Sequence, residues 1–151
     1  MPIPNEIIDN SDDNKLFSFL NWALRDCPKT NLDITTAFFD IKAYSLVKNN
    51  LNGVNQFRLL LGKPPEIKSE KTLGDVLSEE IRQNLESLEL SKRCNDTVKQ
   101  LIDFLKKENV EVRLFEDFLH GKAYIFDNLI VIGSSNFTGA GLTRYGELNT
   151  W

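Results

Sequence analysis

The sequence predicts an α/β protein in which a mixed, largely parallel β-sheet is flanked by helices on both faces. Short apolar runs alternate along the chain with segments whose apolar residues recur at helical spacing. Within residues 32–62 the order is strand, helix, strand, and such a βαβ unit places its two strands parallel. The 151 residues, 41% hydrophobic and 26% charged, suit one globular domain that covers residues 1–151.

The individual elements are expected from local spacing. Helices are indicated where apolar residues repeat every three or four positions, and strands where they alternate or run together between turn residues. Residues 1–13 are polar and contain proline, which predicts a loose lead-in. The expected elements are, in order, a helix from Leu16, a strand over 32–39, a helix over 44–51 closed by Asn52-Gly53, a strand over 57–62, a helix over 73–88 after the break at Lys63-Pro64-Pro65, a helix over 97–107, a strand over 110–114, a strand from His120, a strand over 129–132, and a strand that includes 148–151.

Charge and cysteine content narrow the functional classes. A net charge of −4 does not favour tight nonspecific binding of nucleic acid, which needs clustered basic residues. A solvated surface of mixed charge is the simpler interpretation of the basic residues, and the alternative is a local basic rim made by Lys42, Lys48, Arg58, Lys63, Arg113, Lys122 and Arg144. Cys27 and Cys94 form no metal-binding spacing, which predicts reduced thiols and a cytoplasmic location. No apolar run approaches the roughly 20 residues of a membrane span.

The only histidine, His120, begins the most informative part of the sequence. On a strand, residues two apart point to the same face, about 7 Å from one another, so His120 and Lys122 would face a common ligand. Imidazole can act as a nucleophile or a general acid near neutral pH, and the lysine offers a positive charge to a phosphoryl oxygen. Together with the following turn Gly133-Ser134-Ser135-Asn136, this pair predicts a phosphate site.

The hairpin that follows His120 decides which side chains share its face. Asp127-Asn128 is a turn signal, and a three-residue loop over 127–129 would place Lys122 opposite Ser134 and His120 opposite Asn136. A two-residue loop would turn Ser134 to the other face, and the chain would then have to distort after Gly133. The phosphate chemistry favours the three-residue loop.

The order His120-x-Lys122-x4-Asp127, followed by Gly133-Ser134-x-Asn136, resembles the signature of the phospholipase D superfamily. The motif covers about the last 30 residues. Its local sequence is most similar to that of phospholipase D-like domains at the N-terminus of DEAD/DEAH-class helicases and in some restriction endonucleases. The resemblance implies phosphodiester hydrolysis through a phosphohistidine, in a nuclease-like domain of a DNA-processing enzyme.

The resemblance also implies a role for each motif residue. His120 would attack phosphorus, or donate a proton to the leaving alcohol, while Lys122, Ser134 and Asn136 would bind phosphate oxygens. Glu147 would accept a hydrogen bond from the imidazole and, with His120, Lys122 and Asn136, complete the catalytic set. Asp127 and Gly133 are expected to be structural. The scheme requires no metal and no cofactor.

One motif provides one histidine, whereas the chemistry that the resemblance implies needs two. A homodimer that places two His120 side chains across one pocket would supply the second. We expect the chain to be an N-terminal fragment of a longer protein, with a helicase region as one continuation, and nucleic acid, DNA in preference to RNA, as its partner.

Other interpretations of the same residues carry less weight. A serine hydrolase is disfavoured because Gly-x-Ser-x-Gly is absent, and Gly139-Ala140-Gly141 lacks the third glycine of a dinucleotide site. Two functions remain open: a metal-independent nuclease, or a noncatalytic module that binds nucleic acid or dimerises a helicase. Phospholipid hydrolysis ranks third, since no amphipathic membrane-binding segment is evident.

Overall fold

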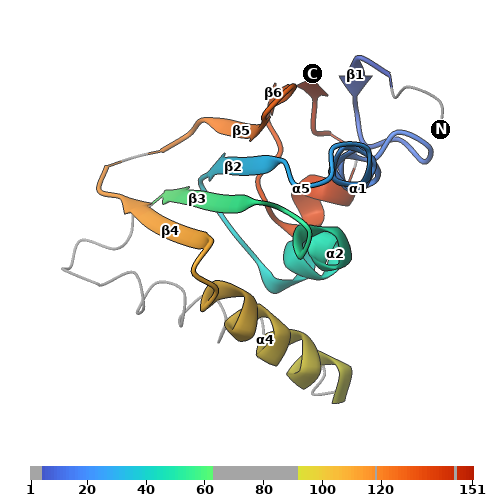
Figure 1. The fold of residues 1–151 in the computed structure, drawn as a ribbon. Helices are drawn as coiled ribbons and strands as arrows, with labels where there is room; N and C mark the ends of the chain where they lie inside the picture. Colours follow the sequence, from blue (N-terminus) through green and yellow to red (C-terminus); the bar gives the residue numbers. More distant parts are fainter. Residues whose placement is uncertain (1–4, 63–91, 118, 145) are drawn as a thin grey trace.

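The computed structural model describes residues 5–62, 92–117, 119–144 and 146–151. Within these residues the helices are α1 (Leu16–Asp26), α2 (Ile41–Leu51), α4 (Lys92–Leu105) and α5 (Gly139–Thr143). The strands are β1 (Ile7–Ile8), β2 (Asn31–Thr36), β3 (Gln56–Gly62), β4 (Val110–Phe115), β5 (Lys122–Phe126), β6 (Ile130–Gly133) and β7 (Asn149–Thr150). They form one sheet, with β1 at one edge and β4 at the other (Figure 1).

The sheet is mixed, as the sequence predicts. Its strand order is β1-β7-β6-β5-β2-β3-β4. Strands β2, β3 and β4 are parallel neighbours, which confirms the expected βαβ unit through α2. The remaining neighbours, from β2 through β5, β6 and β7 to β1, pair antiparallel. Parallel pairing is therefore confined to one half of the sheet, and β2 lies where the two halves meet. The expectation that the sheet would be largely parallel was wrong, because β5, β6 and β7 follow one another through antiparallel pairs.

The described helices pack against one face of the sheet. In β2 the buried residues are Leu32, Ile34 and Thr36, and the positions between them are only partly buried. The same alternation continues across the neighbouring strands, because residues that pair across a sheet share a face. Phe104 of α4 contacts Phe57 of β3, with 5.2 Å between the ring centroids. The helix expected over residues 73–88 lies outside the described residues.

The two ends of the described chain meet at the β1 edge. Ile7 and Ile8 pair with β7, and the indole of Trp151 packs against Phe19 and Trp22 of α1. Strand β1 is only two residues long, so it has no periodic pattern by which the sequence could have predicted it. None of the helices in the described part of the chain is both long and apolar enough to cross a membrane.

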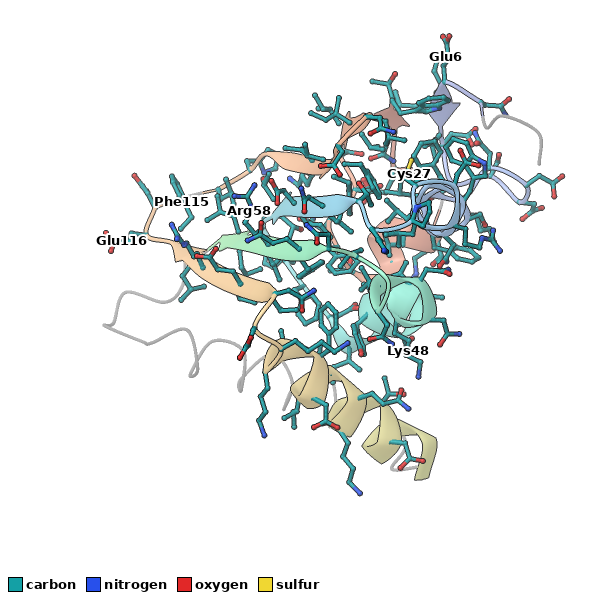
Figure 2. The ribbon with its side chains drawn as sticks, viewed as in Figure 1. Glu6, Cys27, Lys48, Arg58, Phe115 and Glu116 are labelled. Carbon is teal, nitrogen blue, oxygen red and sulfur yellow. The ribbon has the colours of Figure 1, made fainter. Side chains whose placement is uncertain are left out.

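Figure 2 shows that side chains also project from the face of the sheet that these helices leave open. Arg58 of β3 forms an ion pair with Asp33 of β2, and Arg113 of β4 with Glu111. Beyond β2, towards β1, the exposed residues on the sheet are Thr150 and isoleucines, among them Ile125, Ile130 and Ile132. The open face is thus charged on its parallel side and apolar on its antiparallel side.

Candidate phosphate-binding active site

His120 and Lys122 lie together at the start of β5. The strand begins at Lys122, so His120 precedes it by two residues rather than lying within it. The ammonium Nζ of Lys122 turns back to the histidine, where it lies 3.1 Å from Nδ1 and donates to the backbone oxygen at 2.7 Å. The structure therefore brings the predicted cation to the predicted nucleophile.

Lys122 is buried to a degree that is unusual for lysine. Only 7% of the residue is exposed, because it shares the helix-covered face of β5 with Tyr124 and Phe126. Burial lowers the pKa of the ammonium, and the negative charge of Glu147 partly offsets this shift. Glu147 is thus close enough to Lys122 to affect its charge, as a member of the same site would be.

The β5–β6 hairpin does not have the expected register. Ile125 pairs with Ile130, Lys122 pairs with Gly133, and Phe126 donates to the carbonyl of Leu129. The loop is therefore the two-residue turn Asp127-Asn128, and the prediction of a three-residue loop was wrong. The alternative considered from the sequence applies instead, because β6 ends at Gly133 and the chain leaves the strand there.

Gly133 is required by the close approach of β7. A Cβ atom at this position would lie 2.3 Å from the carbonyl oxygen of Leu148 and 2.6 Å from Cα of Asn149. These are backbone atoms, so no side-chain rotation could relieve the overlap. Glycine at this motif position thus allows β7 to lie against the end of β6.

Ser134 connects the motif turn to Glu147. Its hydroxyl donates to the Glu147 carboxylate and accepts from the backbone N–H of Leu148 at 2.9 Å. Its own N–H donates to the carbonyl of Leu148 at 3.0 Å. In this structure Ser134 therefore positions the carboxylate, and its expected contact with phosphate remains a prediction.

Asn136 lies at the end of β2 and its amide has a defined orientation. The amide oxygen accepts from the backbone N–H groups of Ala37 at 3.1 Å and Phe38 at 3.3 Å, and the Thr36 hydroxyl lies 3.2 Å away. Since an amide nitrogen cannot accept from these donors, Oδ1 must face them. The Nδ2 group makes no hydrogen bond to the described residues and can donate to a ligand.

Other residues position the site but could not be recognised in the motif. Tyr124 is fully buried and donates to the carbonyl of Ser135 at 3.0 Å, and burial raises the pKa of its phenol. Asn149 donates to the Ser135 hydroxyl at 2.9 Å and accepts from its N–H at 3.3 Å. Thr36, Tyr124 and Asn149 hold the turn from three different strands. Because only the folded sheet brings them together, no spacing within the sequence indicates this role.

Asp127 lies at the opposite end of β5 from His120. Its carboxylate accepts from the backbone N–H and the side-chain amide of Asn31, each at 3.0 Å. These bonds attach the hairpin turn to the start of β2. The geometry therefore agrees with a structural role for this motif residue.

The expected basic rim is only partly available. Arg58 and Arg113 are engaged by carboxylates on the open face, and Lys63 lies outside the described residues. Lys48 donates to the side-chain oxygen of Gln100, at the far end of α2 from the site. Over the described ranges, no three His, Cys, Asp or Glu side chains cluster as a metal site would require.

These observations define a mixed α/β domain with a buried lysine, a histidine and an oriented asparagine at one end of its sheet, a combination suited to holding a phosphoryl group. The family model described as "Cardiolipin synthase, PLD-like domain" matches residues 26–151, and the chain therefore belongs to this phospholipase D-like family. Membership indicates phosphodiester hydrolysis as the general activity. No curated protein matches the chain.

Proposed function

We propose that the chain is a metal-independent phosphodiesterase that acts on nucleic acid, with DNA favoured, through a covalent intermediate on His120. A homodimer would provide the second imidazole, and the domain would serve a DNA-processing enzyme such as a helicase. The observation that supports this proposal best is the contact between the Lys122 ammonium and His120 Nδ1 at 3.1 Å, on a lysine that is almost completely buried.

The proposed reaction has two displacements. A ring nitrogen of His120 attacks phosphorus, the bond from phosphorus to the leaving alcohol breaks, and the partner subunit's His120 gives that alcohol a proton. Water then attacks the phosphohistidine, the P–N bond breaks, and the partner's imidazole takes the proton from the water. The products are a phosphomonoester and an alcohol, and both imidazoles return to their starting state.

The lysine contact constrains the protonation state of His120 in each subunit of such a dimer. An ammonium only donates, so Nδ1 of His120 accepts from Lys122 and a neutral ring carries its proton on Nε2. In this state Nε2 has no lone pair for attack on phosphorus. The partner's ring that donates the proton to the leaving group must be an imidazolium, whose Nδ1 also carries a proton and no longer accepts from Lys122. Attack through Nε2 would require the ring to change tautomer, which Lys122 would permit by moving its ammonium from Nδ1 to a phosphoryl oxygen.

Asn136 and Glu147 complete the proposal. The Nδ2 group of Asn136 would donate to a second phosphoryl oxygen, where negative charge increases in the transition state. The carboxylate of Glu147, which Ser134 holds, would keep Lys122 charged despite its burial. It would also accept from Nδ1 of His120 once Lys122 has moved to the phosphate.

A noncatalytic module is the second candidate, and the charge distribution favours it. The chain is acidic, and Arg58 and Arg113 are already paired with carboxylates. On the open face of the sheet, little unpaired positive charge therefore remains for a long nucleic-acid strand. In this alternative the same phosphate site would bind or position nucleic acid, or the domain would dimerise a helicase, without cleaving a bond.

The test compares the wild-type chain with His120→Ala in EDTA, at a concentration at which sedimentation gives the mass. The substrates are plasmid DNA, methyl p-nitrophenyl phosphate and phosphatidylcholine vesicles. We expect a dimer that cleaves DNA and the small diester, with both activities lost in the variant and an acid-labile phosphoryl adduct in the wild type. Hydrolysis of the vesicles alone would assign a lipid substrate, and a folded dimer that binds DNA without cleaving anything would establish the noncatalytic function.

A further inference from the structure

Residues 38–42, between β2 and the first turn of α2, lie alongside residues 136–139. The backbone N–H of Phe38 donates to the Asn136 side chain, and Phe39 forms a parallel bridge with Phe137. Asp40 donates through its backbone N–H to the Phe137 carbonyl and accepts from the N–H of Gly139 through its side chain. The segment therefore begins at the proposed phosphate site and leads away from it.

Phe38 is the exposed member of a phenylalanine pair. Phe39 is buried and packs on Phe137 with 5.6 Å between the ring centroids, whereas 46% of Phe38 is exposed. A phenylalanine this exposed contributes little to the core. Its backbone N–H nevertheless donates to the Asn136 side chain, so an accessible aromatic residue adjoins the group proposed to bind phosphate.

Lys42 lies four residues farther along the same segment. A Cβ atom built on Gly139 would meet Cβ, Cγ and Cδ of Lys42 at 2.5–2.8 Å, so the aliphatic part of the lysine rests on this glycine. Its ammonium makes no ion pair or hydrogen bond to the described residues. Four residues span at most about 14 Å. A strand of a few nucleotides is long enough to cover that distance, since even the stacked strand of a duplex advances about 3.4 Å per nucleotide.

We propose that Phe38 and Lys42 form a strand-binding subsite of the active site: Phe38 stacks on a base next to the phosphate held by Asn136, and Lys42 binds a neighbouring backbone phosphate. The inference rests on the proposed nuclease function and specifies its ligand as single-stranded nucleic acid. An exposed ring and an available ammonium, in sequence along one segment, match the alternation of base and phosphate along a strand.

The test measures binding, so that it does not depend on turnover. In a His120→Ala background, fluorescence anisotropy compares oligothymidylate with an abasic deoxyribose-phosphate strand of equal length. We expect Phe38→Ala to weaken binding of oligothymidylate by about 5- to 150-fold, the range for loss of base stacking, and to leave the abasic strand unchanged. We expect Lys42→Gln to weaken both strands and to reduce the salt slope by about 0.7–1.

Two variants serve as matched controls. Phe115, 40% exposed at the end of β4, lies two strands from β2 (Figure 2), and Lys48 lies at the other end of α2 from Lys42. Phe115→Ala and Lys48→Gln should leave the affinities unchanged. Phe38→Trp should retain the preference for oligothymidylate, which separates the loss of an aromatic ring from any defect in folding.

Three other outcomes would contradict the proposed strand-binding subsite. If the parent chain binds oligothymidylate and Phe38→Ala has no effect or weakens both strands equally, the subsite is wrong while the nuclease proposal stands. If the parent chain binds neither strand, the nucleic-acid substrate itself is wrong. If it instead binds phosphatidylglycerol vesicles and Phe38→Ala reduces that binding, the ring contacts lipid.

Discussion

Replacing Asn136 by aspartate should abolish phosphodiester hydrolysis without destabilising the fold. The substitution preserves shape, and a carboxylate oxygen would accept from the N–H groups of Ala37 and Phe38 as the amide oxygen does. On the side where Nδ2 now lies, however, a donor would become a negatively charged acceptor. The change therefore separates the structural use of this side chain from its proposed use in catalysis.

The expected loss of activity comes from two terms. Removing one donor that stabilises developing charge costs about 10²- to 10³-fold in kcat. A carboxylate about 4 Å from a phosphoryl charge adds a repulsion on the order of 4 kcal/mol at an effective dielectric of about 20. Together the terms exceed roughly 10⁴-fold, so the variant should show no measurable hydrolysis.

Asn136→Ala provides the comparison. It removes the acceptor of two backbone N–H groups, and each unsatisfied donor costs about 1–3 kcal/mol, towards the lower value here because the site is only partly buried. We expect a loss of about 2–3 kcal/mol, which lowers Tm by about 4–12 °C in a chain of this length. The assays are hydrolysis of methyl p-nitrophenyl phosphate and thermal unfolding. If Asn136→Asp hydrolyses the diester within a few-fold of the wild-type rate, Nδ2 of Asn136 does not act as the proposed donor. If Asn136→Asp and Asn136→Ala lower Tm equally, the assigned orientation of the amide is wrong.

Three further predictions concern Lys122 and Gly133. Lys122→Met should abolish hydrolysis while Tm stays the same or rises, because burial already disfavours the charged ammonium, and thermal unfolding checks this. Because the pKa of Lys122 is lowered in the folded state, Lys122 loses its proton there at a lower pH than it does in the unfolded chain. Stability should therefore rise with pH in a window below 10.5, and urea titrations of Lys122→Met should show a smaller rise there. In the same window kcat/KM, which reports the pKa values of the free enzyme, should decline as pH rises. Gly133→Ala should lower Tm by several degrees, since its Cβ would overlap the Leu148 carbonyl, whereas Gly53→Ala, with its nearest atom at 3.5 Å, should be nearly neutral.

The sequence predicted the elements that have a strong local pattern. The strand expected over 32–39 is β2, although β2 ends earlier, at Thr36. The helix over 44–51 is α2 and the strand over 57–62 is β3, with the parallel pairing that a βαβ unit requires. Their buried residues repeat at the period of the element they form. For such segments the local pattern and the tertiary environment agree, so the pattern is sufficient.

The hairpin register could not be predicted because its second strand lacks such a pattern. Residues 129–132 are all apolar, yet Val131 is buried while Ile130 and Ile132 are exposed. A strand that is apolar on both faces fits either register equally well. The choice was therefore made from the expected chemistry, which required Ser134 and Asn136 to face His120. In the structure the turn after Gly133, rather than strand alternation, orients these two side chains.

The position of the site follows from the change of strand direction at β2. Because β5 pairs antiparallel with β2, the beginning of β5 lies at the end of β2, and Ala123 pairs with Thr35. His120 and Lys122 therefore lie at the same end of the strands as Asn136, which is held by the residues that follow β2. If β5 were parallel to β2, the same motif would place His120 at the opposite end of the strands from the N–H groups of Ala37 and Phe38 that hold Asn136. The motif thus supplies the reactive groups, and the antiparallel step between β2 and β5 brings them to one end of the sheet.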